Sequence, residues 1–194
     1  MAAKTGRVRI IAGSLKGKSL RYPPGRDIRP SMQQVKAAVF DSLGDELRGA
    51  VFVDLFAGAG GVGLEAISRG AKFVHFVENN RTALELLRAN LTSCAVDERR
   101  AKIYPVSVFD FLSEGDACER IAPDILYADP PYDTAEPGML IASINSLHYI
   151  GNCTIIMEHR RDLPVEEISA VKRTRLKKFG RSWVSFFDST EGYP

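Results

Sequence analysis

Short apolar runs alternate with segments of helical periodicity over most of the chain from Ala50 onward. The apolar runs predict strands at residues 50–57, 73–78, 101–108, 124–129 and 153–159. Between them, amphipathic segments predict helices at residues 61–70, 80–91 and 138–147, with a short helical piece at 110–115. Strands that alternate with helices form a parallel sheet covered on both faces. The pattern therefore predicts an α/β fold.

Two further elements flank this alternation. Residues 8–25 mix apolar runs with glycines, which predicts a β-hairpin or a short β-meander. An amphipathic helix is predicted over residues 29–47, because Pro30 stands at its start and apolar residues lie on one face. Near the other end, residues 173–188 place a glycine turn between two strand-like runs and predict a closing hairpin.

The composition is that of a globular protein. At 194 residues the chain can bury a core in one domain, and no apolar run approaches the roughly 20 residues of a membrane span. No secretory signal is visible at the N-terminus. The three cysteines are widely separated, so reduced thiols and a cytoplasmic location are expected. Neither the cysteines nor the three histidines have metal-ligand spacing, and no metal site is expected.

The basic residues are concentrated at the N-terminus. Residues 1–36 hold nine Lys or Arg and one acid, so the rest of the chain has 17 of the 26 basic and 23 of the 24 acidic residues. A basic arm on an acidic body suggests a polyanionic partner; a solvated tail is the alternative. We therefore divide the chain into a basic extension, residues 1–30, and an α/β domain, residues 31–194.

A glycine-rich loop follows the first strand of the α/β domain. It reads Gly58-x-Gly60-x-x-Gly63, and Glu78 lies 20 residues after Gly58. This spacing suits a dinucleotide loop and a nucleoside-cofactor loop almost equally, with Glu78 accepting hydrogen bonds from a ribose. Asp54, near the end of the first strand, would repel a pyrophosphate. It would suit the cationic amino-acid moiety of S-adenosylmethionine.

The strand at residues 124–129 ends in Asp129, Pro130, Pro131 and Tyr132. Proline lacks an N–H and fixes φ, so the chain is stiffened just where the strand leaves the sheet. A rigid turn with a surface tyrosine would be the purely structural interpretation.

Four blocks in this order, "RIIAGSLKGKSL", "RPSMQQVKAAVFDSL", "VDLFAGAGGVGLEAISRGA" and "DPPY", span nearly the whole chain. Together they resemble the RsmD-type family, whose members methylate guanine N2 in bacterial small-subunit ribosomal RNA. The resemblance implies a class I methyltransferase with a Rossmann-like, seven-stranded, mostly parallel sheet whose last strand is antiparallel. It also implies an N-terminal β-hairpin that helps to hold the RNA.

The same resemblance implies a cofactor site for S-adenosyl-L-methionine. The methionine part would lie on the loop formed by Asp54, Phe56, Ala57, Gly58 and Gly60, with Asp129 beside it. Glu78 would bind the ribose, and Asn79 and the Val108 N–H would lie at the adenine. The family usually has Asp-Ala where this chain has Ser107-Val108, which leaves either Ser107 or Asp110 in place of the family's carboxylate.

The turn after the fourth strand would then be catalytic. An exocyclic amine is a poor nucleophile, and acceptors for its two hydrogens favour attack on a methyl group. The Asp129 carboxylate and the Pro130 carbonyl would be those acceptors, held in place by Pro131. Tyr132 would stack on the flipped base. RNA contacts are expected at five basic residues, namely Arg9, Lys16, Lys18, Arg21 and Arg29.

The expected partner is small-subunit ribosomal RNA or an assembling small ribosomal subunit, with the protein acting as a monomer. Three kinds of alternative stay open. The first is another methyltransferase, acting on adenine N6 or on protein glutamine. The second is a nicotinamide-dependent oxidoreductase, and the third is a non-catalytic RNA-binding protein.

Overall fold

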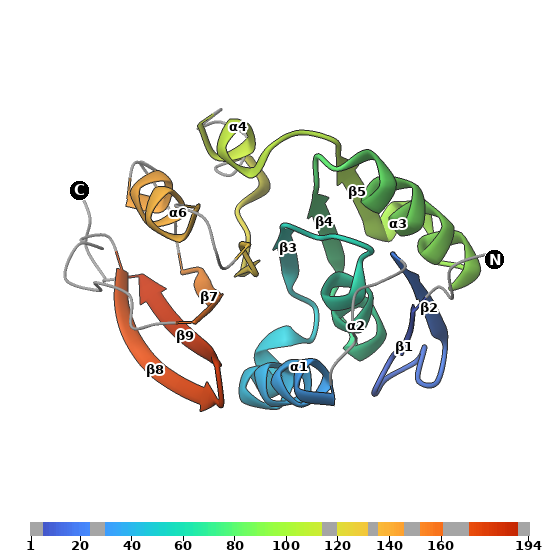
Figure 1. The fold of residues 1–194 in the computed structure, drawn as a ribbon, viewed down its shortest axis with the longest axis horizontal. Helices are drawn as coiled ribbons and strands as arrows, with labels where there is room; N and C mark the ends of the chain where they lie inside the picture. The colour runs from blue at the N-terminus through green and yellow to red at the C-terminus, as the bar shows by residue number, and fades with distance from the viewer. Residues whose placement is uncertain are drawn as a thin grey trace.

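A twisted β-sheet lies between two layers of helices, with a small hairpin packed on one side (Figure 1). The computed structural model describes residues 6–23, 30–113, 120–131, 136–145, 152–160 and 171–189. In these residues the sheet has seven strands in the order β5-β4-β3-β6-β7-β9-β8. The predicted α/β architecture is therefore confirmed.

Five of the strands are parallel and follow the predicted apolar runs: β3 (Val51–Leu55), β4 (Phe73–Val77), β5 (Ala101–Tyr104), β6 (Ile125–Ala128) and β7 (Thr154–His159). The closing hairpin consists of β8 (Val171–Phe179) and β9 (Ser182–Ser189). Strand β9, the last in the chain, runs antiparallel to both β7 and β8. The strand order reverses between β3 and β6, where open α/β sheets bind their ligands.

The helices divide between the two faces of the sheet. Apolar residues of α1 (Pro30–Leu43), α2 (Gly61–Arg69) and α3 (Arg81–Ser93) pack against one face. Those of α4 (Val108–Ser113) and α6 (Glu136–Asn145) pack against the other. Short 3-10 helices follow α1 at Gly44–Leu47 and precede β5 at Glu98–Arg100. No helix in the described ranges is long and apolar enough to cross a membrane.

Burial on both faces explains why the parallel strands are almost wholly apolar. In β3, Phe52 stacks between Phe40 of α1 and Tyr127 of β6, with ring centroids 6.3 Å apart in each pair. Val53 and Leu55 belong to the cluster on the opposite face. A polar side chain at any of these positions would be buried against one of the two helical layers, which explains why apolar residues are found there.

The predicted third strand, residues 101–108, is shorter in the structure and ends at Tyr104. Pro105 has no N–H with which to extend the ladder. Helix α4 then begins at Val108, two residues before the predicted helical piece. Ser107 precedes the helix, and its Oγ accepts a hydrogen bond from the Asp110 N–H at 3.0 Å. Serine is a favoured residue at this position because its hydroxyl satisfies a free N–H of the first turn.

The predicted N-terminal hairpin is formed by β1 (Gly6–Arg9) and β2 (Ser19–Tyr22). Its apolar residues Ile10 and Leu20 belong to the cluster shared with α1, α2 and α3. Asn90 of α3 accepts a hydrogen bond from the Arg21 N–H and donates one to the Arg21 carbonyl, at 2.9 and 3.0 Å. A Cβ on Gly13 would stand only 1.9 Å from the Ser68 carbonyl oxygen, so the hairpin turn lies directly on α2.

Glu65 joins the hairpin to two helices. Its carboxylate is fully buried in α2 and accepts hydrogen bonds from the N–H groups of Ile11 and Ala12, at 2.9 and 3.0 Å. It also forms ion pairs with Lys36 of α1 at 3.1 Å and Arg69 at 2.9 Å. Burial alone would raise the pKa of Glu65, but these bonds and charges outweigh it and lower the pKa.

Candidate active site

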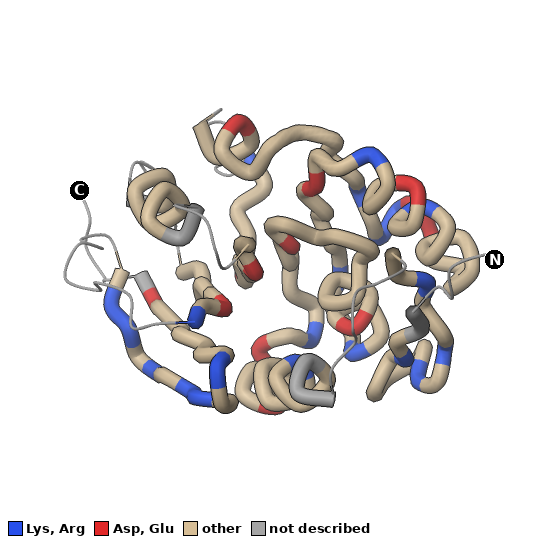
Figure 2. The backbone as a smooth tube through the Cα atoms, in the orientation of Figure 1, with Lys and Arg blue, Asp and Glu red and all other residues tan. Residues whose placement is uncertain are grey.

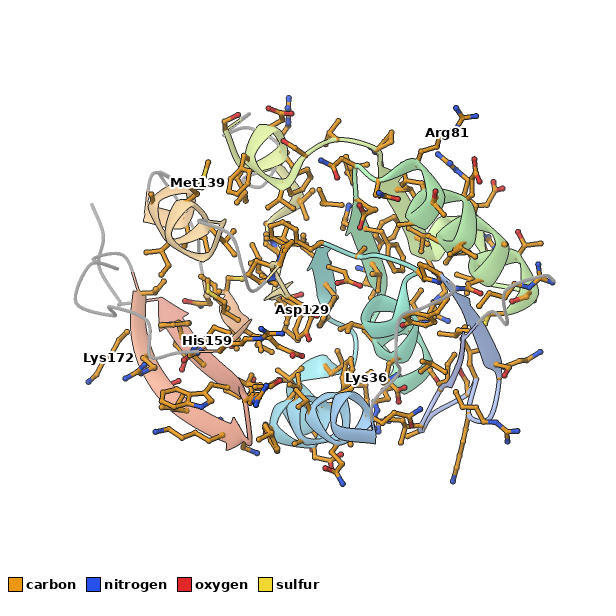
Figure 3. The ribbon with its side chains drawn as sticks, viewed as in Figure 1. Lys36, Arg81, Asp129, Met139, His159 and Lys172 are labelled. Atoms are coloured by element: carbon orange, nitrogen blue, oxygen red, sulfur yellow. The ribbon has the colours of Figure 1, made fainter. Side chains whose placement is uncertain are left out.

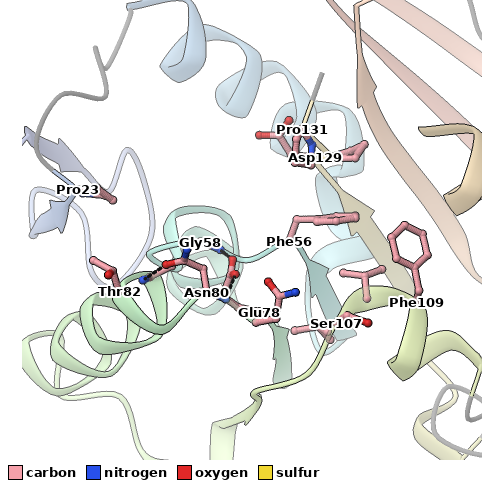
Figure 4. Close-up of a pocket in the computed structure, with 15 residues that line it drawn as sticks. Pro23, Phe56, Gly58, Glu78, Asn80, Thr82, Ser107, Phe109, Asp129 and Pro131 are labelled. Carbon is pink, nitrogen blue, oxygen red and sulfur yellow. Dashed lines mark hydrogen bonds between the residues drawn. The ribbon is translucent and has the colours of Figure 1, made fainter. Parts of the chain in front are cut away.

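A cavity of about 640 Å³ opens at the carboxyl ends of β3, β4 and β6 (Figure 4). Its volume lies within the range typical of small-molecule sites. Nine of the residues predicted for cofactor binding or catalysis line it: Phe56, Gly58, Glu78, Asn79, Ser107, Val108, Asp129, Pro130 and Pro131. The topology thus brings the ends of three strands, which lie up to 73 residues apart in the sequence (Leu55 to Ala128), to one cavity.

Three other predicted residues lie behind the cavity wall. Asp54 is only 2% exposed, and its Oδ2 accepts a hydrogen bond from the Gly63 N–H at 2.8 Å. Ala57 donates its N–H to the Val77 carbonyl, and its own carbonyl accepts from the Gly60 N–H. These three residues shape the glycine loop from inside. Tyr132 lies outside the described residues, as does Arg29.

The loop after β3 turns through left-handed backbone conformations. Phe56, Gly58 and Gly60 have φ angles of 59, 56 and 83°. A Cβ on Gly60 would stand 2.4 Å from Leu87 Cδ1, and one on Gly63 would stand 2.2 Å from Phe76 Cε1. Gly60 is thus required both by its left-handed backbone conformation and by the lack of space for a side chain. Gly63 is required by the close approach of α2 to β4. This packing explains the glycine spacing seen in the sequence.

Glu78, just after β4, is held in place by the backbone on both sides of it. Its Oε2 accepts from the Gly58 N–H and its Oε1 from the Asn80 N–H, each at 2.7 Å. Asn80 in turn caps α3 by accepting from the Ala83 N–H at 3.0 Å. A carboxylate oxygen can accept more than one hydrogen bond. Glu78 therefore presents a fixed acceptor at the wall of the cavity.

The segment after β5 supplies another part of the wall. Ser107 lines the cavity, whereas Asp110 is exposed and is not among the residues that line it. Of the two candidates left open by the sequence, Ser107 is therefore the one next to the cavity. Phe109 faces Phe56 edge-on, with ring centroids 6.4 Å apart, and the two rings make an apolar patch on the wall. In Figure 4, Phe56 lies between Glu78 and Asp129.

Negative charge is concentrated at this edge of the sheet. Burial, followed by the charges of Asp129 and Glu78, raises the pKa of Asp54 to about 7 against the opposing hydrogen bond from Gly63. The Tyr127 hydroxyl donates to Glu158 Oε1 on the neighbouring strand β7. Burial and the charges of Glu158 and Asp129 raise the pKa of Tyr127 well above its usual value. Such an edge favours a positively charged ligand.

Six residues of the wall were not predicted from the sequence: Pro23, Val77, Asn80, Thr82, Ala83 and Phe109. Four of them lie within five residues of Glu78, and Phe109 follows Val108 directly. These five residues could have been predicted as sequence neighbours of Glu78 and Val108. Pro23 follows the N-terminal hairpin, and its place at the cavity depends on long-range packing. In the described ranges, no group of three His, Cys, Asp or Glu residues is arranged to hold a metal ion.

Comparisons with known proteins agree with this architecture. The family model described as "Conserved hypothetical protein 95" matches residues 8–188. The chain is 30% identical over 182 residues to YlbH of Bacillus subtilis, covering 93% of this chain and 98% of that protein. It is also 30% identical over 182 residues to "Ribosomal RNA small subunit methyltransferase D" of Haemophilus influenzae, covering 93% of this chain and 92% of that protein.

A solved structure shares the fold over nearly the whole chain. The yhhF protein of Escherichia coli superposes with a TM-score of 0.83 at 24% identity, over 96% of this chain and 100% of that one. The family match extends from the first strand of the hairpin to the last strand of the sheet, and it includes every wall of the cavity. The chain therefore belongs to the conserved hypothetical protein 95 family, which is the RsmD-type family that its sequence blocks resemble.

Proposed function

We propose that this protein methylates the exocyclic N2 amine of a guanine in small-subunit ribosomal RNA, with S-adenosylmethionine as the methyl donor. The observation that carries the proposal is the shared cavity. One wall holds Glu78 and the glycine loop, and another holds Asp129 and Pro130 at the end of β6. The proposal is also supported by the relatives named as small-subunit ribosomal RNA methyltransferases, which make the chain a methyltransferase by family.

The cavity fits the chemical groups of S-adenosylmethionine. Glu78 is a fixed acceptor suited to ribose hydroxyls, and the Phe56 and Phe109 rings offer an apolar patch for a base. The carboxylates near the glycine loop suit a cationic amino acid, and a cation there would favour the ionised form of Asp54. The cofactor supplies an activated methyl group on a positively charged sulfur. No nucleophilic side chain is needed for such a transfer.

The chain's own catalytic work is to prepare the amine. Asp129 is half-buried at the end of β6, and Pro130 is buried beside it. Their carboxylate and carbonyl oxygens would accept the two amine hydrogens, which favours a more tetrahedral nitrogen with an available lone pair. Because the two prolines restrict the backbone, these acceptors are positioned before the substrate arrives. Tyr132 is proposed to stack on the base.

Two measurements test the proposed function. The first is transfer of tritiated methyl groups to small-subunit ribosomal RNA, followed by nucleoside analysis; N2-methylguanosine is the expected product. N6-methyladenosine as the product would instead support the adenine alternative. The second compares thermal shifts with S-adenosylhomocysteine and NAD. A ligand at 100 times its Kd stabilises the folded state by about 2.7 kcal/mol, and stabilisation by NAD alone would support the oxidoreductase.

The Glu78→Ala variant should bind the cofactor at least tenfold more weakly, equivalent to about 1.4 kcal/mol. The change removes the ribose acceptor and also frees the N–H groups of Gly58 and Asn80. Calorimetric titration with S-adenosylhomocysteine measures the effect. The Glu85→Ala variant, on the exposed side of α3, is the control and should bind normally. Unchanged affinity in Glu78→Ala would show that the ribose lies elsewhere.

The basic extension is proposed to contact RNA phosphates. Arg9, Lys16, Lys18 and Arg21 are all exposed on the N-terminal hairpin. In the Lys16→Ala/Lys18→Ala variant, two lost phosphate contacts should reduce the log–log salt slope of RNA binding by about 1.4 to 1.8. Binding of S-adenosylhomocysteine should not change. A wild-type slope with full methylation would mean that this part of the extension is only solvated.

The full substrate is proposed to be ribosomal RNA, either free or in an assembling small subunit. We further propose a monomer in the cytoplasm. Cys94 and Cys153 are both buried, as expected for reduced thiols in a reducing compartment. Residues 1–30 are proposed to act as an RNA-contacting extension of the catalytic domain, residues 31–194.

A further inference from the structure

The C-terminal hairpin carries a second concentration of positive charge. Residues 171–189, which form β8 and β9, contain six Lys or Arg and a single acid, Asp188. Without them the chain has 20 basic and 23 acidic residues, so this hairpin makes the net charge of the protein positive. Figure 2 shows the basic positions as a series along β8, at the outer edge of the sheet.

Some of these cations have structural partners. Arg175 donates to the Ser42 carbonyl at 3.1 Å, and the Lys177 ammonium lies 2.5 Å from Ser42 Oγ. The Lys178 ammonium lies 3.8 Å from the centre of the Trp183 ring. The two contacts with Ser42 fix β8 to the end of α1, and the Lys178 contact joins β8 to β9.

Other cations of the hairpin face solvent. Lys172, near the start of β8, and Arg181, in the turn before β9, are both exposed. Lys172 points away from the sheet in Figure 3. Their charges are therefore available to a partner outside the protein.

The position of the hairpin relates it to the candidate active site. Strand β9 pairs with β7, and β7 pairs with β6, the strand that Asp129 follows. Trp183, two residues after Arg181, lies opposite His159 at the carboxyl end of β7, so the hairpin turn is at the same edge of the sheet as Asp129. Lys172 lies opposite Asp188, which pairs with Thr154 at the amino end of β7.

Helix α1 lies between the two hairpins (Figure 1). Its Lys36 contacts the Glu65 carboxylate that holds the N-terminal hairpin, and its Ser42 contacts β8. The two basic hairpins thus stand on opposite sides of one helix.

We infer that the β8–β9 hairpin is a second contact surface for the phosphate backbone of the RNA substrate, running from Arg181 at the carboxyl edge of the sheet to Lys172 at the opposite end of β8. This inference rests on the proposed function, because it assumes an RNA substrate at Asp129. Outside residues 1–36 and this hairpin, the chain has 11 basic and 22 acidic residues. That part of the protein repels a polyanion on average, so the two hairpins provide the attraction on the two sides of the site.

Protection of a sheet edge is the simpler explanation for lysines on β8. Charged side chains on an edge strand hinder pairing with another molecule. The opposite edge strand, β5, carries only Lys102 in its four residues. The fraction of Lys and Arg residues in β8 is therefore higher than in the other edge strand of the same sheet.

The test measures RNA binding as a function of salt for Lys172→Gln/Arg181→Gln, with in vitro transcribed small-subunit RNA as the probe. Loss of two phosphate contacts should reduce the log–log salt slope by about 1.4 to 1.8, with Arg181→Gln alone giving about half. The KM for RNA should rise while kcat at saturating RNA is unchanged. Lys72→Gln/Lys102→Gln removes two exposed lysines from the other side of the sheet and is the matched control, expected to keep the wild-type slope.

Equal slopes in the test variant and the wild type, or equal reductions in the test and control variants, would overturn the inference. The first result, accompanied by self-association, would show edge protection; the second would show a general effect of net charge. Wild-type methyl transfer to RNA is measured in parallel. If it is present while the test variant keeps its slope, the hairpin inference alone fails. If wild type transfers no methyl group to RNA, the proposed function fails as well.

Discussion

The Asp129→Ala variant should lose methyl transfer by at least about 10²–10³-fold, the typical cost of removing one hydrogen-bonding group that stabilises a transition state. Asp129 stands at the end of β6 beside Pro130, where it is proposed to accept a hydrogen of the reacting amine. Its removal leaves the glycine loop and Glu78 in place. Affinity for S-adenosylhomocysteine should therefore change much less than kcat. Single-turnover methyl transfer and calorimetric titration measure the two effects separately.

The Asp129→Asn variant is the matched comparison. It keeps the size of the side chain and one oxygen acceptor but removes the negative charge, so its activity should lie between those of wild type and Asp129→Ala. Equal losses of cofactor affinity and of turnover in Asp129→Ala would contradict this assignment. Such a result would show that the main role of Asp129 is to bind the cofactor and not to accept a hydrogen of the amine.

The Glu65→Ala variant should lose about 3–5 kcal/mol of folding free energy, as expected when one partner of a buried ion pair is removed. It leaves the Lys36 ammonium buried without its carboxylate, and it removes the acceptor of the Ile11 and Ala12 N–H groups. Denaturant unfolding measures the change. Glu85→Ala is the control: it also removes an i,i+4 partner of an arginine, but an exposed one, and typical helix-surface pairs contribute only about 0.3–0.5 kcal/mol.

The stabilisation by Glu65 should also depend on pH. Because its pKa is lower in the folded protein, its ionisation favours folding above the unfolded pKa of about 4.3. That contribution is lost as the pH falls from there toward the folded value. The stability difference between wild type and Glu65→Gln should therefore shrink on acidification below about pH 4. A difference that stays constant across this range would exclude the ionised carboxylate as its source.

Periodicity predicted the order of the elements because burial on both faces of a parallel sheet leaves a clear apolar signature. Strand β3 shows it well, with Phe52 and Val53 facing opposite helical layers. The main difference came after β5, where a single proline ended a strand whose apolar pattern continued. Local backbone chemistry at Pro105 decided the boundary there, not hydrophobicity.

The candidate site was predictable where a residue's task is local. Glu78 could be placed from its spacing to Gly58, because a strand, a turn and a helix fix that geometry. The position of Asp54 behind the loop could not be predicted from sequence spacing. It depends on the Gly63 N–H in the first turn of α2, which turns the carboxylate toward the helix. Pro23 at the cavity depends on the docking of a distant hairpin, for which the sequence holds no local signal.

Helix α2 serves both ligands of the proposed reaction. Its first turn follows the glycine loop at the cofactor cavity, and Gly61 in that turn has so little space that a Cβ would stand 1.8 Å from the Tyr22 hydroxyl of the N-terminal hairpin. Glu65 and Ser68, further along the same helix, hold the hairpin turn. The proposed RNA-contacting extension and the cofactor loop are therefore joined through a single helix. By thermodynamic reciprocity, any factor by which RNA on the hairpin changes cofactor affinity is the factor by which the cofactor changes RNA affinity.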